Sequence, residues 1–302
     1  MYKILLFSLF SLLGALNLSQ AASLNFSMNA VSALAKLESS SGGRLGVMAI
    51  NTSNNQSIEY RSQERFPLGC TSKVLAVASL LHESVANPKI LEEKIYYTPE
   101  DIKKSEWAPI TEKHLKHGLS VKELSAAAIE YSDNAAMNAL VYKIGGLKII
   151  NQFIINTLGD HLTHLDNLWP KEAYISLNNL QDSSTPKAIA ADYQKLVLGN
   201  VLAPYQKFLL QTWLKNSVTG KLRIRAGTPK TWLVGDKTGT AQYGTTNDVA
   251  IIWPPHCQPI ILAVYFTQNT KNAIKREDII ANATKIILTH FIQQDSCLQK
   301  NL

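Results

Sequence analysis

A thiol and an amine lie one helical turn apart in the stretch FPLGCTSKVL, residues 66–75, where a helix is predicted to begin. At a helix N-terminus, Cys70 would feel the positive end of the helix dipole, and Lys73 would lie on the same face. Both effects favour the thiolate and lower the pKa of a cysteine from about 8.5 towards neutrality. The pair therefore predicts a thiolate nucleophile, with Gly69 leaving space beside the sulfur. The alternative is that Cys70 is a small buried apolar residue.

Two further short motifs could act with this nucleophile. Ser132-Asp133-Asn134 lies between two predicted helices, and Lys237-Thr238-Gly239-Thr240 lies on a predicted strand. Each motif is weak alone, because Ser-Asp-Asn is also a good helix cap and Lys-Thr-Gly occurs by chance in many chains. In this order, the three stretches match the S-x-x-K, S-D-N and K-T-G set of penicillin-binding acyl-transferases and class A β-lactamases, with Cys70 replacing the first serine.

The chain resembles a class A β-lactamase along nearly its whole mature length. Beyond the three motifs, the resemblance is carried by RFPL before Cys70 and by SEWAPITEKHL (105–115), TGKLRIRAG (219–227) and KTGTAQYGTTNDVAIIWP (237–254). It implies a hydrolase that opens the β-lactam ring through a covalent acyl-enzyme, in a cleft between two subdomains. No cofactor is implied, and the cysteine spacing predicts no metal site.

The resemblance assigns roles to several side chains of this cleft. Ser132 can relay a proton to the leaving nitrogen of an opened lactam, and Asn134 can hydrogen-bond a side-chain amide of the substrate. Lys237 and Thr238, together with Arg223, are expected to bind a substrate carboxylate. In the family a guanidinium reaches this place from a neighbouring strand; the alternative for Arg223 is a solvated surface residue.

Two further assignments concern the reacting carbonyl and the cleft mouth. The backbone N–H groups of Cys70 and Thr240 would form an oxyanion hole, in which one donor typically lowers a barrier by about 3–4 kcal/mol. Trp107 is expected to line the mouth of the cleft, with a core tryptophan as the alternative.

The resemblance fails in THLDNLWPKEAYISLNNLQDSSTP, residues 163–186, which corresponds to the family's Ω-loop. In that family a Glu of this loop activates the water that removes the acyl group. Ungapped alignment places Trp169 at the Glu position. An indole there would exclude water, and loss of a general base alone typically lowers a rate by about 10²–10⁴. We therefore expect acylation to survive and deacylation to be impaired, leaving a long-lived thioester on Cys70.

Other positions of this loop are also changed. Ala173 replaces the Asn that helps to hold the water, and Asn167 replaces an Arg that pairs with the closing Asp, here Asp182. Glu172, three residues after Trp169, is a possible displaced base if the loop is rebuilt.

The elements that position these motifs predict an α+β fold (an α/β sandwich). Strands are predicted early and late in the chain and helices between them: strands at 44–52 and 56–62, a helix at 71–85, helices from about 119 to 215, strands at 231–241, 248–254 and 259–267, and a helix at 277–293. We expect one five-stranded antiparallel sheet flanked by N- and C-terminal helices, with an inserted all-helical subdomain. The sheet subdomain would cover about 22–64 and 217–302, and the helical subdomain about 65–216.

The N-terminal sequence is typical of an export signal. A basic start, the apolar run ILLFSLFSLLGALNL and the small residues SQAAS predict a signal peptide at 1–21, cleaved after Ala21 or Ala22. A membrane anchor is the alternative, but the run is short for a span. We thus expect one β-lactamase-like domain at 22–302 in the periplasm, with no membrane span.

Three cysteines in an oxidising compartment suggest one disulfide and one remaining thiol. Cys257 opens the last predicted strand and Cys297 ends the last predicted helix, which should run back antiparallel to that strand. A Cys257–Cys297 disulfide is therefore predicted, with Cys70 left as the thiol.

The charge of +7 is scattered along the chain, so it indicates neither a nucleic-acid nor a membrane partner. We expect a monomer that acts on a small-molecule β-lactam. Three alternatives remain: a covalent β-lactam binder or sensor without turnover, a thiol acyl-transferase or peptidase acting on cell-wall peptides, and a degenerate or deliberately altered chain.

Overall fold

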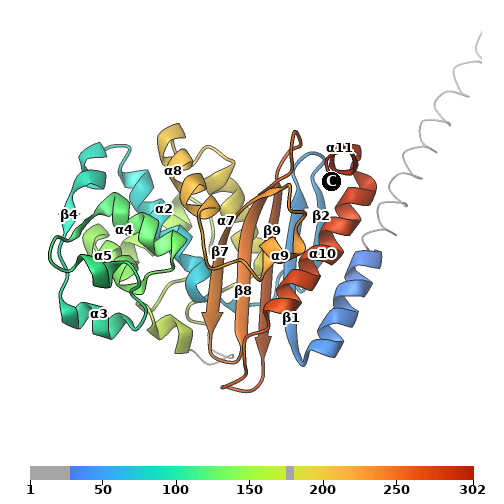
Figure 1. The fold of residues 1–302 in the computed structure, drawn as a ribbon, viewed down its shortest axis with the longest axis horizontal. Coiled ribbons are helices and arrows are strands. Elements are labelled where there is room, and N and C mark those ends of the chain that lie inside the picture. The colour runs from blue at the N-terminus through green and yellow to red at the C-terminus, as the bar shows by residue number, and fades with distance from the viewer. Residues whose placement is uncertain (1–27, 175–179) are drawn as a thin grey trace, which may run out of the picture.

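The computed structural model describes residues 28–174 and 180–302, so the predicted signal peptide at 1–21 lies outside the described residues. A five-stranded antiparallel sheet forms the centre of the fold (Figure 1). Its strands follow the order β2 (Gln56–Tyr60), β1 (Gly43–Asn51), β9 (Ile260–Gln268), β8 (Thr245–Trp253) and β7 (Leu233–Ala241). The predicted sheet, built from both ends of the chain, is confirmed.

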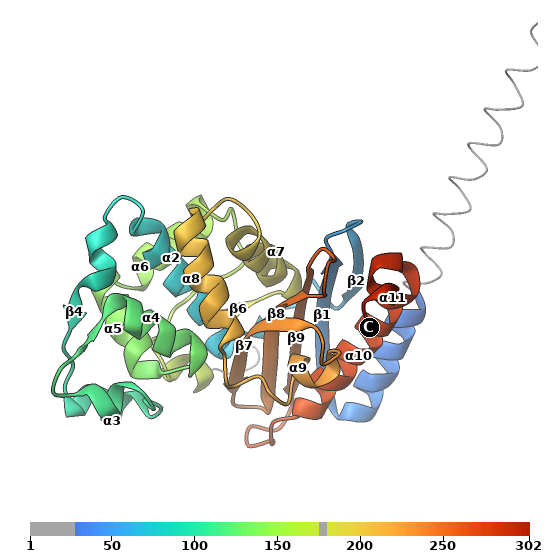
Figure 2. The ribbon, with the colours of Figure 1, turned by 45° about the horizontal axis from the view of Figure 1, so that its top comes forward.

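The central strands are buried on both faces, as their continuous apolar sequences require. In β9, Ile261, Ala263 and Tyr265 point to one side of the sheet, towards α7 (Pro186–Val197) and the inserted helices. The intervening β9 residues point to the other side. There they pack on α10 (Glu277–Gln294) and on the helical residues 28–41. Figure 2 shows the two layers of helices on either side of the sheet.

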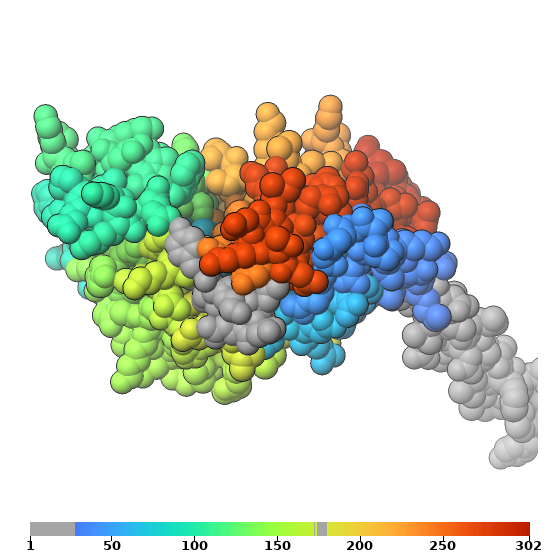
Figure 3. All heavy atoms as spheres, turned by 90° about the horizontal axis from the view of Figure 1, so that it is seen from below, coloured from blue at the N-terminus to red at the C-terminus, as the bar shows by residue number. Residues whose placement is uncertain are grey.

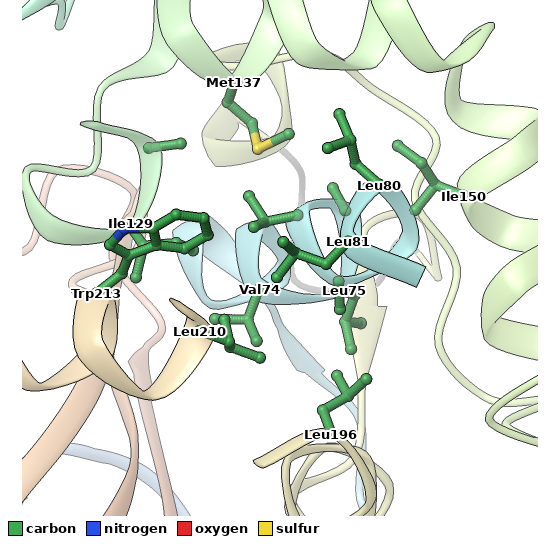
Figure 4. Close-up of a cluster of buried hydrophobic side chains, with 14 of the residues drawn as sticks. Val74, Leu75, Leu80, Leu81, Ile129, Met137, Ile150, Leu196, Leu210 and Trp213 are labelled. Atoms are coloured by element: carbon green, nitrogen blue, oxygen red, sulfur yellow. The ribbon is translucent and has the colours of Figure 1, made fainter. Parts of the chain in front are cut away.

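The helices inserted between β2 and β7 pack around α2 (Lys73–Glu83). This helix is apolar on all sides, and its residues from Lys73 to Leu81 are buried, as expected for a helix at the centre of a core. Val74, Leu75 and Leu81 project from α2 in several directions and meet side chains of the surrounding helices, among them Met137 and Trp213 (Figure 4).

The remaining elements are short connectors and covering helices. They are β3 (Phe66–Pro67), η1 (Gly69–Ser72), η2 (Pro88–Glu92), β4 (Lys94–Ile95), α3 (Pro99–Ser105), η3 (Thr111–His114), β5 (Leu119–Ser120), α4 (Val121–Glu130), α5 (Asn134–Ile144), α6 (Leu147–Asn156), η4 (Lys171–Tyr174), β6 (Ser183–Ser184), α8 (Pro204–Lys215), α9 (Ile224–Gly227) and α11 (Ser296–Lys300). The helices predicted between about 119 and 215 are therefore present. Within 163–186, the segment that corresponds to the Ω-loop, the described residues before α7 form only η4 and β6.

Both ends of the described chain meet at one side of the molecule. Seen from below, the first described residues (blue) lie against residues from the C-terminal part of the chain (orange-red and red; Figure 3).

Cys257 and Cys297 are joined by a disulfide with an S–S distance of 2.03 Å, which is the pairing that the sequence predicts. Cys297 does not end α10, however. The chain breaks at Asp295, whose carboxylate caps the separate helix α11.

Among residues 28–174 and 180–302, no helix has the length and apolar character needed to cross a bilayer.

Candidate active site

Cys70 lies in η1, a 3₁₀ turn directly before α2, and its side chain is half-buried. Buried hydroxyls hold this turn: Thr71 Oγ1 donates to Leu68 O at 2.8 Å, and Tyr193 OH donates to Thr71 O at 2.9 Å. Gly69 has a φ of +51°, a value that favours glycine, and a Cβ there would lie 3.1 Å from Thr240 N. Glycine at 69 therefore lets the nucleophile turn lie directly against β7.

Lys73 is fully buried, and its amine connects two of the three motifs. Its Nζ donates to Asn134 Oδ1 at 2.6 Å, to Ser132 O at 2.7 Å and to Ser132 Oγ at 3.4 Å. Asn134 in turn donates to Ser105 O at 2.9 Å. Asp133 caps α5 by accepting from Ala136 N, which fixes the loop that carries these groups.

The Ser132 hydroxyl brings the third motif into the same cluster. Lys237 Nζ donates to Ser132 Oγ at 2.8 Å, and Lys237 is fully buried on β7. Ser132 has a φ of 58°, in the left-handed region that few residues other than glycine adopt. Such a conformation persists only where its surroundings impose it, and it is common at functional sites. The sequence motifs thus meet around one hydroxyl that lies between two lysines.

The surroundings of Cys70 favour its thiolate. Burial raises the pKa of this thiol, but the charges of Lys73 and Lys237 and hydrogen bonds from Ser132 and Lys73 outweigh burial, so the pKa lies below its ordinary value. The predicted direction of this shift agrees with the structure.

The pKa of Lys237 is lower than that of an ordinary lysine. Burial, assisted by the charges of Lys73 and Arg223, lowers its pKa to about 8, although the charges of Cys70 and Asp236 act against this shift. A buried lysine with a pKa in this range can switch between a cation that binds an anion and a neutral amine that accepts a proton.

Arg223 is 3% exposed, so the alternative of a solvated surface residue is wrong. Its Nη1 donates to Gly239 O at 2.8 Å and its Nη2 to Thr240 Oγ1 at 2.7 Å. It does not come from a strand, as the resemblance implied, but stands at the N-cap of the short helix α9. The guanidinium nevertheless contacts the segment of β7 that carries Gly239 and Thr240.

Trp107 is 55% exposed, so it is not a core tryptophan. Its indole Nε1 donates to Tyr131 O at 3.0 Å, and its carbonyl accepts from Asn134 N at 2.8 Å. Trp107 is therefore tied to the same loop as Ser132 and presents an exposed ring beside it.

Trp169 lies close to the amine of Lys73. The ring centroid is 5.7 Å from Lys73 Nζ, and the side chain is 2% exposed. Asn138 fixes its backbone, because Asn138 Nδ2 donates to Trp169 O at 2.7 Å and Asn138 Oδ1 accepts from Trp169 N at 3.1 Å. A bulky apolar ring thus fills the space beside Lys73.

The neck of the loop is closed by hydrogen bonds from amide groups to the Asp182 carboxyl group. Asn167 Nδ2 donates to Asp182 Oδ2 at 2.8 Å, and the N–H groups of Asp166 and Asn167 donate to Asp182 Oδ1. Burial raises the pKa of Asp182, against the effect of these hydrogen bonds. Asn167 therefore occupies the place of the expected arginine and still holds the closing aspartate.

The candidate base Glu172 belongs to η4, but its side chain lies outside the described part of the structure. The neighbouring Ala173 O accepts from Gln242 N at 2.9 Å, so η4 is anchored to the end of β7. Among the described residues, no group of three or more His, Cys, Asp or Glu side chains could hold a metal ion.

Sequence reasoning missed residues that support the cluster from a distance. Thr219 shares a 2.7 Å hydrogen bond with Thr238, and Asn247 donates to the carbonyls of Pro67 and Leu68, which precede the nucleophile turn. Thr219 and Asn247 both lie in stretches that carry the family resemblance, which was the only signal for them.

The comparisons with known proteins point to one family. The model of the β-lactamase enzyme family matches residues 29–291. The chain is 45% identical to β-lactamase OXY-1 of Klebsiella oxytoca over 257 residues, covering 84% of this chain and 86% of that protein. It is 44% identical to β-lactamase Toho-1 of Escherichia coli over 277 residues, covering 90% and 93%.

Solved structures agree. The class A β-lactamase of Mycobacterium abscessus superimposes with a TM-score of 0.83 at 38% identity, covering 87% of this chain and 99% of that chain. The β-lactamase of Streptomyces albus G gives 0.84 at 36% identity, covering 86% and 98%.

Proposed function

The chain belongs to the class A β-lactamase family and is a hydrolytic enzyme of that class, and we propose that it opens β-lactams through a thioester on Cys70 that is removed only slowly. The observation that carries acylation is the Ser132 hydroxyl held between Lys73 and Lys237 beside the Cys70 thiol. This arrangement provides a nucleophile, two amines and a proton relay within hydrogen-bond reach of one another.

Binding begins at β7. Lys237, Thr238 and Arg223 form the positively charged edge that takes the substrate carboxylate, and Asn134 and Trp107 contact the substrate side chain. These contacts would place the lactam carbonyl over η1, with the N–H groups of Cys70 and Thr240 as donors to its oxygen. The close approach of Gly69 to Thr240 N supports this assignment, because it puts the two donors on adjoining backbone segments.

Acylation is the next step, and the charges of Lys73 and Lys237 favour it because they stabilise the Cys70 thiolate. The Cys70 thiolate attacks the lactam carbonyl carbon, and the electron pair of the C–O double bond moves to the oxygen. On collapse, the C–N bond breaks and the nitrogen takes a proton from the Ser132 hydroxyl, which is replenished by a lysine ammonium. The product is a ring-opened acyl group in thioester linkage to Cys70, with Lys73 and Lys237 beside it.

Removal of the acyl group is the impaired step. Trp169 fills the space beside Lys73 and has no carboxylate. It can therefore neither position a water nor act as a base. The same observation favours a second candidate function, a covalent β-lactam binder or sensor that stays acylated. The two functions differ only in the lifetime of the thioester.

The proposal also covers the location of the protein and its organisation into subdomains. Residues 1–21 would direct export to the periplasm, and residues 22–302 would form a single catalytic domain with a sheet subdomain and an inserted helical subdomain, acting as a monomer without a cofactor.

The test is a burst experiment with a chromogenic cephalosporin at micromolar protein. We expect a rapid colour change equal to one equivalent of protein, followed by slow turnover, and no burst from the Cys70→Ala variant, with its fold checked by thermal denaturation. Fast linear hydrolysis without a burst would contradict slow deacylation. The absence of any colour change would contradict β-lactam opening itself.

A further inference from the structure

Ser132 carries the hydroxyl that lies nearest to the proposed thioester. Its Oγ accepts from Lys237 Nζ at 2.8 Å and from Lys73 Nζ at 3.4 Å, and it also hydrogen-bonds to Cys70. The side chain is 8% exposed, and the left-handed backbone at 58° limits where it can point. After ring opening, this hydroxyl would therefore remain beside the new thioester carbonyl.

We propose that the acyl group moves from Sγ of Cys70 to Oγ of Ser132, which makes Ser132 a second acyl acceptor as well as a proton relay. This inference rests on the thioester proposed above. It concerns what happens to an acyl group for which position 169 provides no carboxylate to activate a water, because Trp169 occupies the space beside Lys73.

The step balances within the site. The Ser132 oxygen attacks the thioester carbonyl carbon, and its proton passes to the neutral amine of Lys237. The tetrahedral intermediate collapses with cleavage of the C–S bond, and the electron pair leaves with the sulfur. The products are an oxygen ester on Ser132, a Cys70 thiolate and a Lys237 ammonium. No oxidant, reductant or further reactant is needed, and the mass of the acylated protein does not change.

Acylation itself prepares Lys237 for this role. The pKa of Lys237 is lowered to about 8 mainly by burial, and also by Lys73 and Arg223, while Asp236 and the negative charge of Cys70 raise it. Once Cys70 carries an acyl group, its charge is lost, so the pKa of Lys237 falls further. The Lys237 amine is then neutral in a larger fraction of molecules than before acylation, and the neutral amine can accept a proton from the hydroxyl with which it shares a hydrogen bond.

The direction of transfer also follows from general chemistry. An oxygen ester is more stable than a thioester, and the leaving thiolate is stabilised by the two adjacent lysines. Because hydroxyl and carbonyl are held in one site, the reaction is effectively intramolecular, a condition that raises effective concentrations to as much as about 10⁵–10⁸ M when the geometry is good. Ser132 would thus outcompete a water that has no base to activate it.

The test follows the position of the adduct over time. The mature protein is mixed with benzylpenicillin, quenched in acid from milliseconds to hours, treated with iodoacetamide and digested with trypsin. Cleavage gives separate peptides for Cys70 (66–73) and Ser132 (123–143). We expect the adduct first on peptide 66–73 and later on peptide 123–143, while Cys70 regains its reactivity towards iodoacetamide and the total adduct mass persists.

A matched variant separates transfer from simple release. In Ser132→Ala the adduct, however slowly it forms, should be confined to peptide 66–73, and Cys70 should stay blocked for as long as the adduct lasts. The proposal is overturned if the wild-type adduct stays on Cys70 until it disappears, or if penicillin is consumed and no adduct appears on Ser132 at any time. Absence of both adduct and consumption would overturn the thioester itself, and with it this inference.

Discussion

The indole ring of Trp169 lies 5.7 Å from Lys73 Nζ, measured from the ring centroid. Two hydrogen bonds from Asn138 hold the backbone of Trp169 there, and the side chain is almost fully buried. The Lys73 amine therefore faces an indole ring, where the family resemblance led us to expect a carboxylate. In the proposed reaction this relationship would affect the two steps differently, because the acylation cluster is intact whereas deacylation would lack a base at position 169.

Replacing this ring with a carboxylate should restore turnover. Trp169→Glu places an acid near Lys73 and frees space for a water, so we expect the adduct lifetime to shorten by about 10²–10⁴. The matched control is Trp169→Leu, which removes the indole without supplying a base and should shorten the lifetime far less. Equal acceleration in both variants would show that access of water, and not the base, limits deacylation. A slower release in Glu172→Gln would instead identify Glu172 as a displaced base.

The reactivity of Cys70 should persist below the pH range of an ordinary thiol. Because Lys73 and Lys237 hold the pKa of Cys70 below its usual value, the thiolate fraction falls less between pH 8.5 and pH 7 than it does in an ordinary thiol. An ordinary thiol with a pKa of about 8.5 would lose more than about tenfold in alkylation rate over this range. Iodoacetamide labelling of Cys70 against pH measures this directly, and a tenfold loss would contradict the assignment.

Acylation by a penicillin should have an upper pH limit as well. Lys237 has a pKa of about 8, so its positive charge, and with it the attraction for a substrate carboxylate, is lost as the pH rises through this value. We expect second-order acylation by benzylpenicillin to fall above pH 8. Labelling by the neutral iodoacetamide should not fall in parallel, which distinguishes lost substrate binding from lost nucleophile.

Stability should depend on a buried carboxyl pair near the Ω-loop. Burial, together with the charge of Asp160 and a hydrogen bond to it, raises the pKa of Asp192 to about 9. The unfolded chain loses this proton near its ordinary pKa, so stability falls as the pH rises from about 4 to 9. Asp192→Asn removes this penalty, and we expect it to raise Tm at pH 7 by at least about 2 °C and to flatten the pH dependence of Tm.

The matched variant on the partner carboxylate should act in the opposite direction. Asp160 Oδ1 accepts from Leu162 N at 2.7 Å and from Thr163 N at 3.1 Å, so Asp160→Asn weakens the start of the loop and should lower Tm. A destabilised Asp192→Asn would contradict the assignment of a protonated carboxyl group to Asp192 in the folded protein.

Much of the fold was predictable because its signals are local. Short apolar runs bounded by turn sequences identified the five strands, and helical periodicity identified α10 and the helices between β2 and β7. The break between α10 and α11 was missed, because Asp295 interrupts an otherwise helical run by capping the next helix with its own carboxylate.

The site was less accessible from sequence, because its geometry depends on contacts between distant segments. The motifs identified Cys70, Ser132 and Lys237. They did not show that the Ser132 hydroxyl would lie between Lys73 and Lys237. Asn138 carried no signal at all: its role appears only when the loop residue Trp169 folds against α5.

The central claim is that a β-lactam forms a lasting covalent bond to this protein through Cys70. The most direct measurement is intact-protein mass spectrometry of the mature chain mixed with benzylpenicillin and sampled from seconds to hours, with Cys70→Ala in parallel. The account predicts one added penicillin per protein, persisting for many minutes and absent from the variant. Rapid consumption of penicillin without a persistent adduct, or an adduct that survives in Cys70→Ala, would contradict it.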